Sequence, residues 1–68
     1  MTIETIKAEV KRIEGLSWDS EVAHGREDDL HQAVLANIAD GTLEGCTPAE
    51  AAREALKSTN ISFARWCA

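Results

Sequence analysis

The chain has 68 residues, with 12 acidic residues against 7 Lys and Arg and a net charge of −5 when both histidines are neutral. This length allows one small hydrophobic core and no separate substrate or cofactor domain, so we expect a single helical domain over residues 1–68. The negative charge argues against direct binding to nucleic acid or to an anionic membrane, because either would need a basic face.

The N-terminal segment, MTIETIKAEVKRIEG, is amphipathic and charged, whereas a signal peptide would be continuously apolar. The sequence also lacks a run of about eighteen apolar residues that would indicate a transmembrane helix. These features predict a cytoplasmic protein. In that compartment we expect Cys46 and Cys67 to be reduced thiols, not a disulfide.

Residues 3–14 are predicted to form the first helix, because apolar residues recur at spacings of three and four: Ile3, Ile6, Val10 and Ile13. Residues 17–25 (SWDSEVAHG) hold several capping and turn residues, and Gly25 weakens any helix through it, so a loop or a single turn is expected. A second helix is predicted over residues 26–39. Its apolar face would hold Leu30, Val34, Leu35 and Ile38, with Gly41 past its end.

The segment Thr47-Pro48-Ala49-Glu50 combines a capping threonine, a proline at the first helical position and a glutamate three residues after the cap. It predicts a third helix over residues 48–57. Residues 58–60 (STN) would end this helix, and residues 61–66 are predicted to form a short C-terminal helix or turn. No segment alternates β-branched and polar residues as a strand would. The predicted fold class is therefore all-α, a small bundle of three helices with a short C-terminal element.

The net charge is concentrated in the middle of the chain. Residues 19–44 contain seven acidic residues and one base, Arg26, and so carry −6, whereas the two flanking segments sum to 0 and +1. A segregated field of this kind attracts basic surfaces and speeds encounter with them. The seven acids are therefore the candidate partner-binding residues: Asp19, Glu21, Glu27, Asp28, Asp29, Asp40 and Glu44.

The run Glu27-Asp28-Asp29 also has a purely structural interpretation. Acidic residues in the first turn of a helix interact favourably with its macrodipole, so the run could simply mark the start of the second helix. This interpretation leaves the other four acids unexplained. A structural role and a functional acidic face therefore both remain open for the run.

Metal binding and thiol chemistry are alternative uses of the polar residues. His24 and His31 are seven positions apart, about 10 Å on a helix, which is too far to share one ion. If the helix extended back through Gly25, His24, Asp28 and His31 would lie on one stripe, and adjacent pairs could chelate a metal weakly. Cys46 and Cys67 lack metal-ligand spacing, and a catalytic thiol would need a base supplied by a tertiary contact. Phosphate-binding loops and hydrolase motifs are absent from the sequence. We expect no metal, no cofactor and no catalytic residue.

Phe63 and Trp66 are three positions apart and would share a face if their segment is helical. One interpretation is a lid over the bundle, because so small a core needs large side chains. The other is an exposed aromatic anchor for a partner, because tryptophan and arginine are frequent at interface hot spots and Arg65 lies between the two aromatics.

Residues 23–41 (AHGREDDLHQAVLANIADG) and 47–68 (TPAEAAREALKSTNISFARWCA) resemble small hypothetical proteins encoded by bacteriophages and mobile elements of proteobacteria. The resemblance implies a small, acidic, intracellular accessory protein, and some members of this class inhibit host defence, as anti-CRISPR proteins do. It assigns no functional residue.

Charge and resemblance together lead to one hypothesis, a non-enzymatic inhibitor that docks on a basic, nucleic-acid-handling surface of a partner protein. The alternative is a self-associating helical module with a structural or regulatory role, which would form a homodimer. Its contact would be the apolar seam Ile3-Ile6-Val10-Ile13 or the Phe63-Trp66 patch.

Overall fold

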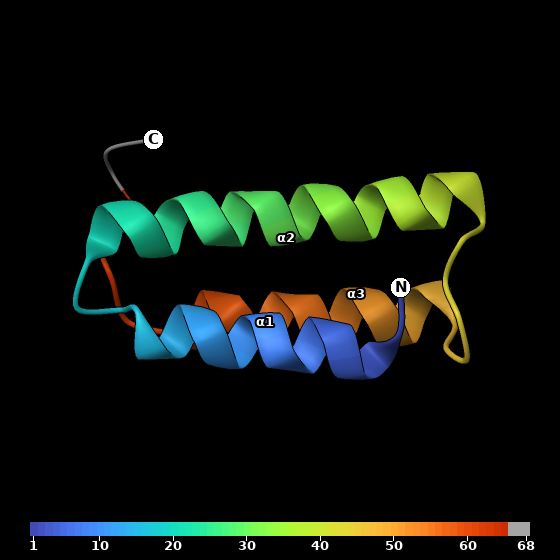
Figure 1. The fold of residues 1–68 in the computed structure, drawn as a ribbon, viewed down its shortest axis with the longest axis horizontal. Helices are drawn as coiled ribbons and strands as arrows, with labels where there is room; N and C mark the ends of the chain where they lie inside the picture. Colours follow the sequence, from blue (N-terminus) through green and yellow to red (C-terminus); the bar gives the residue numbers. More distant parts are fainter. Residues whose placement is uncertain (66–68) are drawn as a thin grey trace.

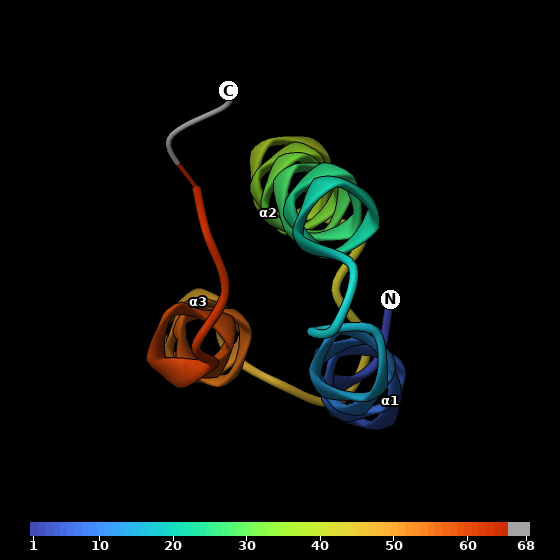
Figure 2. The ribbon, with the colours of Figure 1, turned by 90° about the vertical axis from the view of Figure 1, so that its left-hand side faces the viewer.

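The computed structural model describes residues 1–65 and consists of helices joined by short connections. These are α1 (Ile3–Gly15), α2 (Ser20–Asp40), α3 (Pro48–Leu56) and a short 3₁₀ helix, η1 (Lys57–Asn60). α2 lies along one side of the pair formed by α1 and α3 (Figure 1), and the end-on view places the three helices at the corners of a triangle (Figure 2). The expected all-α bundle with a short C-terminal helix is confirmed. That helix lies at residues 57–60, ahead of the expected 61–66, of which residue 66 lies outside the described residues.

α1 forms where the apolar spacing predicts it. Thr2 caps its N-terminus, where the side-chain Oγ1 accepts a backbone hydrogen bond at 3.2 Å. Ile6 and Ile13 are fully buried, and Ile3 and Val10 are half-buried. The seam that could have mediated self-association therefore packs inside this chain's own bundle.

α2 begins at Ser20, so the expected loop over residues 17–25 was wrong from Ser20 onwards. Asp19 caps the helix, with its Oδ1 accepting a backbone hydrogen bond at 3.3 Å. Ala23 and Glu27, on either side of Gly25, are both buried, so tertiary packing outweighs the weak helix propensity of Gly25. The helix ends at Gly41, whose φ of 68° is the left-handed conformation that glycine adopts at helix ends.

α3 begins with the predicted capping box. The backbone N–H of Thr47 donates to Glu50 Oε1 at 2.9 Å, and the backbone N–H of Glu50 donates to Thr47 Oγ1 at 3.1 Å. The buried residues of α3 are Ala51 and Ala55, whose small side chains allow the helix to lie close to its neighbours.

The core lies between the three helices, and its buried apolar residues are Ile6, Ile13, Ala23, Leu30, Val34, Ala51 and Ala55. After η1, residues 61–65 run without regular secondary structure from α3 to the N-terminus of α2, on the side of the bundle away from α1 (Figure 2). We call residues 61–65 the C-terminal strap. Ile61 and Phe63 of the strap pack against the core, and the N–H of Ala64 donates to Ser20 Oγ at 3.2 Å. Over residues 1–65, no helix has both the length and the apolar character that crossing a bilayer requires.

Candidate functional site

Glu27 is the one member of the predicted acidic set that lies in the interior. It is 5% exposed, and its two carboxylate oxygens accept hydrogen bonds from Arg65 Nε at 2.7 Å and Nη2 at 3.2 Å. The hydroxyl of Ser58 donates to the same carboxylate at 2.7 Å. The hydrogen bond from Arg65 lowers the pKa of Glu27 from its ordinary value, although burial acts in the opposite direction. Glu27 is therefore an internal anion neutralised by Arg65, and it does not belong to a surface that a partner could contact.

Arg65 holds the C-terminal strap in place. Besides the carboxylate of Glu27, its Nη2 donates to the carbonyl oxygens of Ser58 and Ile61, both at 2.9 Å. Its guanidinium also lies over the ring of Phe63, 3.8 Å from the ring centroid. Phe63 is thus part of a lid that covers one end of the bundle. Trp66, the second residue of the expected aromatic anchor, lies outside the described residues.

His31 and Ser58 extend this network but do not form a catalytic pair. His31 Nε2 lies 3.0 Å from Ser58 Oγ and 3.3 Å from the carbonyl oxygen of Ala55. Because the Ser58 hydroxyl donates its proton to Glu27, the proton between His31 and Ser58 must come from the histidine. A nucleophilic serine needs the reverse direction, and Ser58 is fully buried. The cluster therefore serves to attach α3 and the strap to α2.

The other six predicted acids lie outside the core. Asp19 is the half-buried cap of α2, and the five exposed acids are Glu21, Asp28, Asp29, Asp40 and Glu44. Because α2 begins at Ser20, Asp28 and Asp29 lie beyond its first two turns. The macrodipole effect is confined to the first turn, so it does not account for them.

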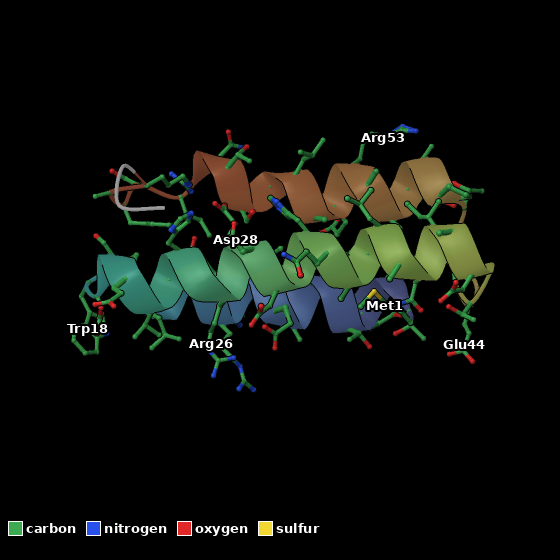
Figure 3. The ribbon with its side chains drawn as sticks, turned by 90° about the horizontal axis from the view of Figure 1, so that it is seen from above. Met1, Trp18, Arg26, Asp28, Glu44 and Arg53 are labelled. Carbon is green, nitrogen blue, oxygen red and sulfur yellow. The ribbon has the colours of Figure 1, made fainter. Side chains whose placement is uncertain are left out.

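The exposed acids, together with Asp19, are spread over the length of α2 and its two flanking loops and are not gathered in a compact patch; we call these six residues the acidic stripe. Trp18, just before α2, and Glu44, just after it, lie at opposite ends of the molecule, while Arg26 and Asp28 lie on opposite edges of α2 (Figure 3). The stripe extends along the 21 residues of α2, about 30 Å, which matches the 32 Å longest extent of the chain.

The net charge of the chain lies entirely on this stripe. With the internal Glu27–Arg65 pair set aside, six acids and one base remain over residues 19–44, giving −5, and the two flanking segments become neutral. The ion pairs along the stripe are long, 3.9 Å for Arg26 with Glu9 and 3.8 Å for the N-terminal amine with Glu44, and His24 Nε2 lies 3.6 Å from the carboxylate of Asp28. Pairs of this length, each with at least one exposed partner, contribute little to stability.

Sequence reasoning missed an apolar groove between α2 and α3. Its volume is about 280 Å³, and its lining residues are His31, Val34, Leu35, Ile38, Ala52, Ala55 and Leu56. Leu35 and Leu56 are 66% and 56% exposed, and Trp18, in the turn before α2, is 80% exposed. The exposure of Leu35 could have been predicted from the sequence. Val34 and Leu35 are consecutive and point about 100° apart on a helix, so both cannot face one core.

The candidate metal and thiol residues that the structure describes do not converge on one point. His24 lies beside Asp28, whereas His31 is bonded within the Ser58 network. Cys46 is a half-buried free thiol, and Cys67 lies outside the described residues. Within residues 1–65, no three His, Cys, Asp or Glu side chains converge on one point.

Comparisons of the chain with protein-family models, with curated proteins and with solved structures gave no match.

Proposed function

We propose that the chain is a non-enzymatic interaction protein whose acidic stripe docks on a basic, normally nucleic-acid-facing surface of a partner protein and inhibits it, as anti-CRISPR proteins inhibit host defence. The observation that carries this proposal is the location of the whole net charge on α2 and its two flanking loops. Carboxylates on such a stripe can occupy positions that phosphates would take on the partner.

The exposed acids have few internal partners, which supports a role in recognition. Over residues 1–65, Glu21, Asp29 and Asp40 form no ion pair with another side chain. Like charges along one helix repel one another and oppose the compact state. A cationic partner would relieve this repulsion, so the stripe is better explained by binding than by folding.

The test has two steps, identification of a partner and competition. The immobilised protein is used to capture a partner from native cell extract, and the purified partner is then assayed for nucleic-acid binding in the presence of the chain. We expect the chain to displace nucleic acid, and added salt to slow its association with the partner, because the Debye length is only about 8 Å at physiological ionic strength.

Charge reversal tests whether the acidic stripe is responsible for binding to the partner. The variant Asp28→Lys/Asp29→Lys should bind the partner at least about tenfold more weakly, since each site replaces an attraction with a repulsion. The control Glu4→Lys/Glu14→Lys changes the net charge equally, at exposed residues of α1. Circular dichroism establishes that both variants fold. Equal binding by two folded variants would refute docking through the stripe.

A further inference from the structure

The surface between α2 and α3 is covered at one end and open at the other. The C-terminal strap covers the end near Ser20, where Arg65 reaches Glu27. Beyond it lies the open groove of about 280 Å³, which runs from His31 to Ile38 on α2. His31 and Ile38 are seven positions apart, which on a helix is about 10 Å, or about two turns.

The chemistry of the groove suits apolar side chains. Val34 and Ala55, both almost fully buried, form its floor, and the exposed side chains of Leu35 and Leu56 lie along it. The one polar lining residue, His31, already shares its Nε2 with Ser58 and the carbonyl of Ala55. A small polar ligand would therefore find few free hydrogen-bonding groups there.

The charges beside the groove favour a cationic occupant. Asp28 lies on the edge of α2 that faces α3 and is well exposed, whereas Arg53, on α3, points away from α2 (Figure 3). Glu44 lies at the far end of α2. A ligand seated in the groove would therefore meet a negative potential from the α2 side, without a base of α3 directed at it.

A second copy of the chain fits this surface poorly. Pairing two grooves would bring together two α2 helices, each carrying the acidic stripe, and like charges would repel. Stable interfaces also bury about 1,200–2,000 Å² in total, far more than a groove two helical turns long offers. A single helix needs less area.

We propose that the open α2–α3 groove docks a short, basic, amphipathic helix of a partner protein. Apolar side chains spaced i and i+3 or i+4 would pack between Leu35 and Leu56, and a Lys or Arg beside them would face Asp28. The docked helix would complete a four-helix packing around α2 and α3. This inference rests on the proposed function and deepens it: the acidic stripe supplies long-range attraction, and the groove supplies the contact.

The test uses the full-length ¹⁵N-labelled protein and a synthetic helical peptide of about three turns, with leucine along one face and lysine elsewhere. We expect saturable amide shifts at residues 31–38 and 52–56. Two control peptides, one with glutamate in place of lysine and one with serine in place of leucine, should bind at least about tenfold more weakly, because they lose either the charge or the apolar contact.

Protein variants locate the site. The variant Leu35→Gln/Leu56→Gln should weaken binding of the leucine–lysine peptide by about tenfold or more, because two apolar contacts are lost. The matched control is Val22→Gln, an exposed apolar residue of α2 outside the groove, and it should leave binding unchanged. Groove substitutions chosen at exposed side chains should leave the fold intact, as circular dichroism would show.

Several outcomes would overturn the proposal. Peptide binding that is lost on reversal of Asp28 and Asp29 but kept in Leu35→Gln/Leu56→Gln would exclude the groove and leave docking through the acidic stripe standing. Binding that needs the leucines but not the acids would instead count against the proposed function. Groove shifts that depend on protein concentration alone would identify a second copy as the occupant, and shifts caused by deleting residues 66–68 would identify the chain's own C-terminal residues.

Discussion

The two ends of the α2–α3 surface differ in which kind of side chain is buried and which is exposed. At the covered end a charged residue, Glu27, is buried, and at the open end two leucines, Leu35 and Leu56, are exposed. The burial of Glu27 is possible because Arg65 and Ser58 supply three hydrogen bonds to its carboxylate. Nothing in the described residues covers the leucines. The covered end therefore stabilises the fold, and the open end is available for contact.

The largest loss of stability is expected when the buried carboxylate of Glu27 is removed. We expect Glu27→Ala to lower the free energy of unfolding by about 3 kcal/mol, because it leaves the partly buried Arg65 and the buried Ser58 without their partner. Urea denaturation measures the loss. The adjacent variant Asp28→Ala, at an exposed site, should change stability by no more than about 0.5 kcal/mol. Similar losses in the two variants would contradict the assignment of Glu27 to the interior.

Arg65→Lys tests the geometry of the covered end with the charge retained. Lysine keeps the positive charge but cannot donate from two nitrogens to Glu27 while also stacking on Phe63. We expect a loss of about 1–2 kcal/mol, smaller than that of Glu27→Ala. Arg53→Lys, at an exposed residue of α3, serves as the control. Wild-type stability in Arg65→Lys would show that the planar contact is dispensable.

The covered end should also give the protein a pH dependence at acid pH. The pKa of Glu27 is lowered in the folded state, chiefly by the hydrogen bond from Arg65. Its contribution to stability is therefore fully present above the unfolded glutamate pKa of about 4.3, and it is lost as the pH falls through the lower folded-state pKa. The stability difference between wild type and Glu27→Gln should shrink over that acid range. A constant difference down to the pH of acid unfolding would argue against the ionised pair.

A substitution at Gly25 can stabilise α2 beside the covered end without altering the hydrogen bonds of Glu27, Arg65 and Ser58. It is exposed, lies inside the helix, and a Cβ added there meets no atom within 4 Å. We expect Gly25→Ala to raise the free energy of unfolding by about 0.5–1 kcal/mol. Gly41→Ala should have the opposite sign, because the φ of 68° at Gly41 disfavours alanine. Thermal melting of both variants would test whether α2 is helical at Gly25 and whether it ends at Gly41 in the left-handed conformation.

The smallest effect on stability is expected at the open end. Leu35→Gln should change the free energy of unfolding by no more than about 0.5 kcal/mol, because its side chain is already exposed. Its neighbour Val34 lies in the core, and Val34→Ala should lose about 2 kcal/mol. A large loss in Leu35→Gln would mean that the open groove is part of the core.

The predictable parts of the molecule were those whose causes are local. α1 follows from apolar spacing, and α3 from the capping box of Thr47 and Glu50, both of which act within a few residues. The start of α2 was missed because Gly25 was weighed by its local propensity, whereas burial of Ala23 and Glu27 against other helices decides the matter. Such packing leaves no mark on the local sequence.

The candidate site shows the same limit. The acidic stripe was visible in the charge distribution, but the internal position of Glu27 depends on Arg65, far along the chain. The groove was missed because Leu35 was assigned to the same apolar face of the second helix as Leu30, Val34 and Ile38. A helical projection of Val34 and Leu35 would have exposed that error, whereas the depth of the groove depends on how far apart α2 and α3 lie.

The distance between Glu27 and Arg65 along the chain has a consequence for the order of folding. The two residues are 38 positions apart, whereas each helix is built from contacts within four residues. The groups that Arg65 joins, the carboxylate of Glu27 on α2 and the carbonyl of Ser58 on η1, come together only once the helices have packed, so we expect the strap to dock after the three helices have assembled. The ion pair is then absent from the folding transition state and present in the native state. Substitutions at Arg65 should accordingly speed unfolding in stopped-flow experiments and leave the folding rate nearly unchanged. Arg65 would then slow the unfolding of the native bundle without helping it to form.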